Sequence, residues 1–359
     1  MPPWYDVNAW NARFGNDSQT VHSLRRFRTR WLKQGRSFEE ALAELSPEVA
    51  SDLKAEIEPH PLQLAERHDS QVDGATKLIF RTDDGLLIES VLLRAGTGRT
   101  SLCISSQVGC AAACRFCATG QMGIARNLST AQILDQVVQA NQLLRDEDRR
   151  VRNIVFMGMG EPLHNPANVT TAITALSSPL LFDYSPQRLL VSTVGIPEEM
   201  VRLDDQFPQV NLALSLHSAD QDERQELIPL AKSVPLSRLR ETLLKLKLSA
   251  KRRIMIEYLM LAERTDRDSD AEKLIAFLKN IPAHINLIPY NSIDGADHLT
   301  GSTQASRERF GHRLKEAGFP VTIRYSLGAD IAAACGQLIQ RENREIARQL
   351  RTSHAAADS

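Results

Sequence analysis

Three closely spaced cysteines are the residues of this sequence that point most directly to chemistry. Cys110, Cys114 and Cys117 lie in the run Gly-Cys-Ala-Ala-Ala-Cys-Arg-Phe-Cys, a CxxxCxxC triplet. A [4Fe–4S] cluster usually takes four cysteine thiolates, so three leave one iron open to another ligand. The amino and carboxylate groups of S-adenosylmethionine (SAM) suit that iron, and an electron passed from the cluster to the sulfonium would release a 5′-deoxyadenosyl radical. The triplet therefore predicts a [4Fe–4S] cluster and SAM as cofactors.

A structural zinc site is the alternative interpretation of the triplet. Zinc takes four nitrogen or sulfur ligands, typically from two separated pairs, and this sequence has no second cysteine pair. Disulfides are not expected, because the five cysteines are odd in number and no signal peptide opens the chain. We therefore expect a reducing, cytoplasmic compartment.

The length and composition are those of an ordinary globular enzyme. A chain of 359 residues predicts one large catalytic body with a smaller appendage. Its apolar runs stop short of the roughly 18 residues that a spanning helix needs, so no membrane segment is expected. The formal net charge of −1 gives no reason to expect nucleic acid binding by the molecule as a whole, so any RNA contact requires a local patch.

The strongest basic patch lies in residues 24–36, where cationic side chains surround Phe27 and Trp31. The cations are Arg25, Arg26, Arg28, Arg30, Lys33 and Arg36. Such a patch grips phosphates and stacks on bases in some RNA-binding proteins. It is equally typical of an amphipathic helix with a solvated basic face and aromatic side chains in the core. The sequence leaves both interpretations open.

Residues 1–98 are predicted to form a small accessory domain that contacts RNA. Helices come first, and the pattern from Ser37 to Glu40 indicates a helix that begins with a capping box. Strands at 77–80 and 86–93, turned at Asp83-Asp84-Gly85, then predict a β-hairpin extension.

Residues 99–330 are predicted to form the catalytic core, leaving 331–359 as a C-terminal segment. Strand-like runs alternate with helical ones, which indicates an α/β fold with parallel strands joined by crossover helices. Six or seven such units approach a TIM-like barrel, and we expect a partial (β/α)6 barrel with its chemistry at the carboxyl ends of the strands. The expected strands are 102–105, 153–157, 189–193, 211–216, 254–261, 284–288 and 321–325, and the clearest helices are 130–144, 236–248 and 268–279.

Polar residues gather at those expected strand ends. Gly158-Met-Gly160-Glu161-Pro follows the second strand, and its glycines allow close backbone approach while its carboxylate suits an ammonium group. Ser192, the run Ser215-Leu-His217 and Asn291 follow later strands, with groups suited to a ribose, a carboxylate or adenine. Each of them is alternatively an ordinary turn, capping or core residue.

These motifs, in this order, resemble the RlmN/Cfr family of radical SAM RNA methyltransferases. The resemblance runs from about Arg30 to Leu338. It is carried by Trp31-Leu-Lys-Gln-Gly35, Cys103-Ile-Ser-Ser-Gln-Val-Gly-Cys110, Arg126-Asn-Leu128, the Gly-Met-Gly-Glu-Pro turn, Ser-Leu-His217, Pro-Tyr-Asn291 and Ala334-Cys335-Gly-Gln-Leu338.

The resemblance implies a role for each of these side chains. It implies that Cys110, Cys114 and Cys117 hold the cluster, and that SAM lies among Gly160, Glu161, Ser192, Ser215, Leu216, His217 and Asn291. In the family's scheme Cys335 first takes a methyl group from one SAM, and a radical from a second SAM removes hydrogen from it. The resulting carbon radical adds to adenine, and Cys103 releases the adduct by forming a disulfide with Cys335. Glu89 aligns with a glutamate assigned as proton acceptor.

The family's known substrates are adenosine carbons in RNA. Some members methylate C2 in 23S ribosomal RNA and in certain tRNAs, and others methylate C8; the shared motifs do not separate them. This chain has Arg324-Tyr-Ser-Leu-Gly-Ala-Asp330 where members often have Arg-Arg-Ser-Arg-Gly-Asp-Asp. The partners implied are RNA and a reducing electron-transfer protein. The alternatives are a radical SAM enzyme with another RNA substrate and a zinc-stabilised, non-catalytic RNA-binding protein.

Overall fold

The structure is a computed structural model that describes residues 3–15, 17–338 and 343. Within these residues, every helix is too short or too polar to cross a bilayer.

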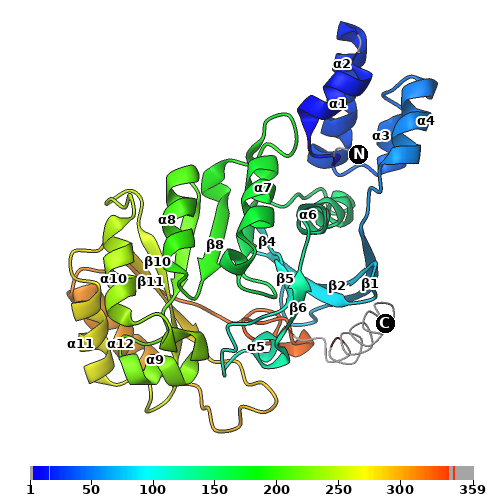
Figure 1. The fold of residues 1–359 in the computed structure, drawn as a ribbon. Coiled ribbons are helices and arrows are strands. Elements are labelled where there is room, and N and C mark those ends of the chain that lie inside the picture. The colour runs from blue at the N-terminus through cyan, green and yellow to red at the C-terminus, as the bar shows by residue number, and fades with distance from the viewer. Residues whose placement is uncertain (1–2, 16, 339–342, 344–359) are drawn as a thin grey trace, which may run out of the picture.

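Four helices and a π-helical turn form a small N-terminal unit that stands apart from the main body (Figure 1). They are α1 (Val7–Phe14), α2 (Ser18–Arg28), η1 (Thr29–Lys33), α3 (Phe38–Leu42) and α4 (Pro47–Glu56). The predicted capping box is confirmed, since Ser37 Oγ accepts from the Glu40 amide while the Glu40 carboxylate accepts from the Ser37 amide.

The aromatic side chains of the basic patch lie inside this unit. Phe27 and Trp31 are 3% and 1% exposed, and both rings pack edge-on against Phe38. Arg26 and Arg30 both form ion pairs with Glu44. The patch therefore matches the second interpretation, an amphipathic helix whose aromatic side chains fill the core, and those rings are closed to RNA bases.

One ten-stranded sheet carries the rest of the fold, in the order β1-β2-β3-β4-β7-β8-β9-β10-β11-β12. β1 to β4 pair antiparallel, and β4 pairs parallel with β7 to start a run of parallel pairs that ends at β12. The strands are β1 (Leu62–Asp69), β2 (Ala75–Thr82), β3 (Leu87–Arg94), β4 (Thr100–Cys103), β7 (Asn153–Phe156), β8 (Leu189–Thr193), β9 (Asn211–Ser215), β10 (Ile254–Met260), β11 (Ala283–Pro289) and β12 (Val321–Ile323).

The predicted hairpin of β2 and β3 is present, and β1 adds an unpredicted third strand to it. Only Leu62 of β1 is buried, and the polar run that follows, Gln63 to Asp69, carries no core-facing apolar alternation. The strand forms because β2 offers it an unpaired edge, which is a tertiary cause that the sequence of β1 does not reveal.

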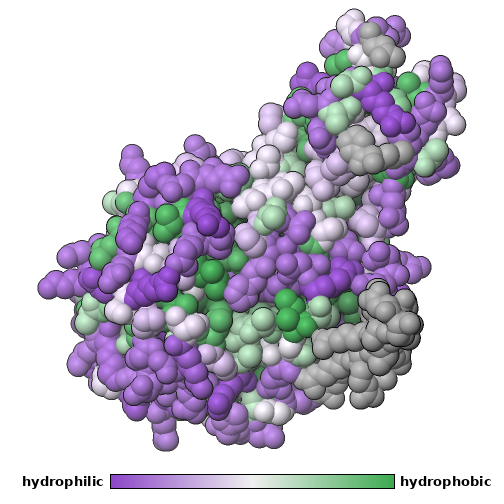
Figure 2. Space-filling model, viewed as in Figure 1, coloured by the Kyte–Doolittle hydropathy of each residue, from purple (hydrophilic) through white to green (hydrophobic). Residues whose placement is uncertain are grey.

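Helices join the parallel strands in six crossovers within the described chain, and this confirms the predicted partial (β/α)6 barrel. The helices are α6 (Thr130–Arg145), α7 (Pro166–Ser177), α8 (Pro197–Gln206), α9 (Gln221–Leu227), α10 (Leu236–Lys245), α11 (Asp268–Phe277) and α12 (Gln304–Glu316), with 3₁₀ turns at Pro162–His164, Pro186–Arg188, Pro229–Lys232 and Ala329–Ile331. Apolar side chains from strands and helices form one core between them. On the face drawn in Figure 2, hydrophilic side chains predominate and hydrophobic ones gather near the middle.

The cysteine triplet lies outside the main sheet, on a loop closed by a small ribbon. β5 (Gln107–Gly109) pairs with β6 (Ile124–Asn127), and α5 (Ala118–Met122) lies between them. The ribbon and α5 lie at the lower edge of the sheet in Figure 1.

Candidate functional site

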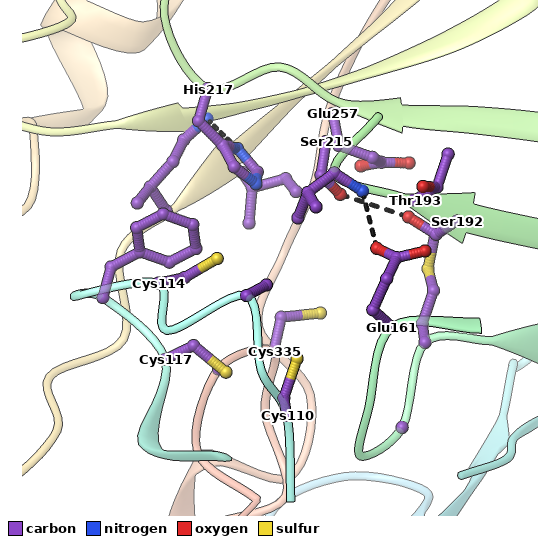
Figure 3. Close-up of a pocket in the computed structure, with 18 of the residues that line it drawn as sticks. Cys110, Cys114, Cys117, Glu161, Ser192, Thr193, Ser215, His217, Glu257 and Cys335 are labelled. Atoms are coloured by element: carbon purple, nitrogen blue, oxygen red, sulfur yellow. Dashed lines mark hydrogen bonds between the residues drawn. The ribbon is translucent and has the colours of Figure 1, made fainter. Parts of the chain in front are cut away.

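The cysteine loop forms one wall of a cavity at the carboxyl ends of the parallel strands. Cys110, Cys114 and Cys117 all line this first cavity. Figure 3 shows their sulfur atoms facing the space between the loop and the strand ends that carry Glu161, Ser192 and Ser215. Backbone hydrogen bonds fix the loop, because Cys110 N donates to Gly123 O (2.8 Å) and Arg115 N donates to Leu227 O (2.9 Å).

The three thiols are buried together. Burial raises the pKa of Cys110 to about 12, and it raises the pKa of Cys114 further because the charges of Cys110 and Cys117 add to it. Thiolates are stable in such a site only when a cation or a metal centre is bound, because the protein alone favours the neutral thiol. The donor set is soft and wholly sulfur, which suits iron–sulfur ligation.

A buried arginine adds a second observation in favour of an anionic group at this wall. Arg224 on α9 is 1% exposed, and its guanidinium donates to Leu216 O (3.2 Å) and Val194 O (2.5 Å). Its Nη1 has no hydrogen-bond partner among the described residues. The Arg224 charge lowers the pKa of Cys114 against the effect of burial. Arg224 is thus a buried cation close to Cys114 with one N–H donor that no protein group within the described ranges accepts. Such a cation would stabilise an iron–sulfur cluster, because thiolate ligands give the cluster a negative charge.

The described part of the chain contains no ligand set for the alternative, a structural zinc ion. There, no three His, Cys, Asp or Glu side chains converge as ligands of a single metal ion must. A [4Fe–4S] cluster makes no such demand, because each cysteine ligates a different iron.

Glu161 lies across the cavity from the cysteine loop. One carboxylate oxygen accepts from Leu163 N (2.9 Å) and the other from Val194 N (2.8 Å). Burial nevertheless raises the pKa of this carboxyl to about 7. The preceding Gly160 has a φ of +102°, and a Cβ there would lie 2.6 Å from Gln107 Cβ, so the turn requires glycine. A bound ammonium group would return Glu161 to its charged form.

Hydroxyl and imidazole groups complete this side of the cavity. Ser192 and Ser215, at the ends of β8 and β9, lie with their Oγ atoms 3.2 Å apart. His217 adopts a left-handed φ of +59°, a conformation that histidine adopts more often than most non-glycine residues. Its Nδ1 accepts from Leu259 N (3.2 Å), and burial lowers its pKa to about 3. His217 is therefore neutral, with an Nε2–H left to donate.

Of two further residues expected at the SAM site, Asn291 lines the cavity and Leu216 does not. Asn291 lines the first cavity, and its Nδ2 donates to Cys335 O (3.1 Å). The side chain of Leu216 lies in the core and is not among the cavity-lining groups. Its amide donates to Leu214 O (2.9 Å) and Glu257 O (3.1 Å), so Leu216 shapes the turn that presents His217.

Cys335 lines both the first cavity and a second, neighbouring cavity. Although the residue as a whole is exposed, its thiol lies within the cavity walls, and this burial raises its pKa while the Arg324 charge opposes the rise. Cys103, at the end of β4, lines the second cavity. Burial, with a smaller contribution from Cys335, raises the pKa of Cys103 to about 12. The structure thus brings both thiols to one space.

The loop that carries Cys335 is held from both sides. Gly336 O accepts from Ala118 N (2.7 Å) at the start of α5, which joins the loop to the cysteine triplet. On the other side Gly328 N donates to Asp73 (2.8 Å), and Ser70 Oγ donates to Asp330 (2.8 Å). The turn between β1 and β2 therefore supports the loop on which Cys335 lies.

Glu89 lies on β3, is 1% exposed and lines neither cavity. Strand alternation puts its side chain on the same face of β3 as Val91 and Leu93, and these two do line the second cavity. Lys77 Nζ lies 3.8 Å from the Glu89 carboxylate.

Sequence reasoning missed two charged residues of the site. Glu257 on β10 and Arg324 after β12 both line the first cavity, and Arg324 lines the second as well. The Glu257 carboxylate accepts from Asn286 Nδ2 (2.9 Å) and lies 3.6 Å from Arg324 Nη2. Burial raises the pKa of Glu257 against the Arg324 charge. A single charge within the apolar run Ile254 to Met260 was the available signal for Glu257.

Comparisons with known proteins identify the family. The model of the radical SAM superfamily matches residues 104–278. A probable RNA methyltransferase of Rhodopirellula baltica is 54% identical over 94% of this chain and 87% of its own length. A dual-specificity RNA methyltransferase RlmN of Geobacter sulfurreducens is 40% identical over 86% of this chain and 84% of its own. The chain belongs to the RlmN family of radical SAM RNA methyltransferases.

A solved structure agrees with this assignment. The crystal structure of a radical SAM methyltransferase from Sphaerobacter thermophilus covers 94% of this chain and 99% of its own, with a TM-score of 0.86 and 34% identity. Radical SAM enzymes in general use SAM and a [4Fe–4S] cluster, so the predicted cofactors agree with the superfamily of the RlmN-type chain.

Proposed function

We propose that this RlmN-type enzyme methylates an adenosine carbon in RNA, with Cys335 as the methyl carrier. The target proposed is C2 of an adenosine in 23S ribosomal RNA, with tRNA as a second substrate. The observation that carries the proposal is the position of Cys335, whose thiol opens on the first cavity at one side and on the second cavity, which holds Cys103, at the other.

The first cavity is the proposed cofactor site. Cys110, Cys114 and Cys117 would hold the [4Fe–4S] cluster, and together the cluster and SAM would supply the one-electron chemistry that an unreactive adenine carbon needs. The proposed SAM contacts are the Glu161 carboxylate for the N–H groups of the amino group, His217 Nε2–H for an acceptor of the ligand, and Ser192, Ser215 and Asn291 for its remaining polar atoms. Gly160 and the backbone of Leu216 shape the turns that present these groups.

The second cavity is the proposed site of substrate attachment and release. Cys335 would become joined through the transferred carbon to the base. The Cys103 thiolate would then attack the Cys335 sulfur, so that a disulfide forms as the bond from that sulfur to the transferred carbon breaks, and the carbon would take up a proton to become the methyl group. Glu89 is the proposed proton acceptor, on the strand face that it shares with Val91 and Leu93. This proposal needs a reducing electron-transfer protein as a partner and a reducing compartment, for which we propose the cytoplasm.

The test is mass mapping of ribosomal RNA and tRNA after anaerobic incubation with reconstituted enzyme, SAM and a reductant. The expected product is a methylated adenosine that is absent when Cys335→Ala replaces the wild type. Synthetic C2-methyl and C8-methyl standards identify the carbon. Methylation that persists in the Cys335→Ala variant would contradict the carrier role.

A further inference from the structure

One aromatic side chain at the second cavity has no place in the function described so far. Tyr325 lines this cavity together with both Cys103 and Cys335. It is 85% exposed, which is more than any other exposed large hydrophobic residue in the described ranges, and none of those others is aromatic. An exposed aromatic ring that also lines a cavity offers its π-face to a ligand that enters there.

The backbone is held in place on both sides of Tyr325. On one side of it, Arg324 N donates to Leu287 O (2.9 Å) on β11. Three residues further on, Gly328 N donates to Asp73 Oδ2 (2.8 Å) in the turn between β1 and β2. A backbone anchored at both ends loses little conformational freedom when the ring binds a partner, so most of the ordering cost is limited to the two side-chain torsions of Tyr325.

The walls of the cavity that Tyr325 lines are largely apolar. They include Val91 and Leu93 from β3, Ile288 from β11 and Leu327 from the same loop as Tyr325. Such a space suits an unstacked nucleobase, which presents two apolar faces and a polar edge. A phosphate, by contrast, would need a cation aimed at it, and the Arg324 guanidinium already lies 3.6 Å from Glu257.

We propose that Tyr325 is a base-stacking platform for single-stranded RNA at the mouth of the second cavity. It holds an unpaired base by its π-face and so guides the target adenosine toward Cys335. This inference rests on the proposed function for the identity of the substrate, and it adds the way in which the RNA is gripped.

The test measures RNA binding without chemistry. Cluster-loaded protein, with no SAM present, is titrated into a short single-stranded oligoriboadenylate that carries one 2-aminopurine, whose fluorescence falls when it stacks. Replacing Tyr325→Ala should weaken binding on the order of tenfold, because one base–aromatic stack is lost. The slope of log affinity against log salt should stay unchanged, because no phosphate contact is lost.

Three controls separate stacking from other causes. Tyr325→Phe and Tyr325→Trp keep a ring and should bind as the wild type does. Val72→Ala removes a side chain that is 80% exposed in the turn between β1 and β2 and lines neither cavity, and it should have no effect. An unchanged thermal midpoint for Tyr325→Ala verifies that the loop still folds.

Two results would overturn the inference. Wild-type affinity in Tyr325→Ala would show that the ring makes no contact with RNA. Equal losses in Tyr325→Ala and Tyr325→Phe would assign the contact to the hydroxyl instead of the ring. In either case RNA methylation by the wild type would leave the proposed function standing, whereas a holoenzyme that binds no RNA would contradict both.

Discussion

The two cavities that meet at Cys335 differ in the kind of group that lines them. The first is lined by the whole cysteine triplet, by a buried carboxylate with a raised pKa and by a neutral imidazole, and backbone amides hold the last two. The second shares Cys117 and Cys335 with the first, and it adds Cys103, largely apolar walls and an exposed tyrosine. The first is therefore suited to a small charged cofactor in one pose, and the second to a flat, largely apolar base.

The largest effect on methylation is expected from a substitution that affects the first cavity alone. Cys114→Ala removes one cluster ligand, so iron and sulfide content, visible absorbance and methylation should all fall to background. RNA affinity in the absence of SAM should remain, because the second cavity is untouched. Iron analysis with the RNA titration described above measures both. A Cys114→Ala protein that retained a full complement of iron and sulfide would refute the ligand role.

The matched change in the second cavity should leave the cofactors in place. Cys103→Ala should assemble the cluster and bind SAM as the wild type does, yet stall with RNA attached to Cys335, because no thiol remains to release it. Denaturing electrophoresis with labelled RNA detects the adduct. If only free protein is recovered, Cys103 has no part in release.

A smaller, graded effect is expected from pH. Because burial raises the pKa of Glu161 to about 7, the carboxyl of the free enzyme becomes neutral as pH falls through that value. SAM affinity should then fall about tenfold per pH unit below about 7, since the neutral carboxyl is a much weaker hydrogen-bond acceptor for the amino group of SAM. His217 stays neutral over this range, because its pKa is about 3, and adds nothing to the profile.

Anaerobic calorimetry from about pH 5.5 to about pH 8 measures this dependence. The control is Glu161→Gln, which should bind SAM weakly and with no slope below pH 7. A wild-type profile as flat as that of the variant would show that Glu161 does not contact the amino group of SAM.

The smallest effect is expected far from both cavities, in the N-terminal unit. Arg26 already forms an ion pair with Glu44, and the aromatic rings beside it are buried. Arg26→Ala should therefore change RNA affinity less than about twofold, because exposed pairs contribute little and no base contact is lost. A tenfold loss in the same titration would return the basic patch to an RNA-binding role.

The sequence predicts regular elements and local motifs better than it predicts contacts between distant segments. The parallel strands and the Ser37 capping box follow from patterns within a few residues. The pairing of Arg26 with Glu44, the meeting of Glu257 with Arg324 and the burial of the Leu216 side chain depend on the folded chain. β1 is not predicted from the sequence for the same reason, because it becomes a strand by pairing with β2.

The position of Cys335 between two cavities is tested most directly by following the methyl group itself. Reconstituted enzyme is incubated without RNA and with SAM that carries a trideuterated methyl group, and the masses of its cysteine-containing peptides are then measured by mass spectrometry. The position of Cys335 predicts one trideuteromethyl group on Cys335 and none on Cys103. A label on Cys103, or no label on Cys335, would contradict it.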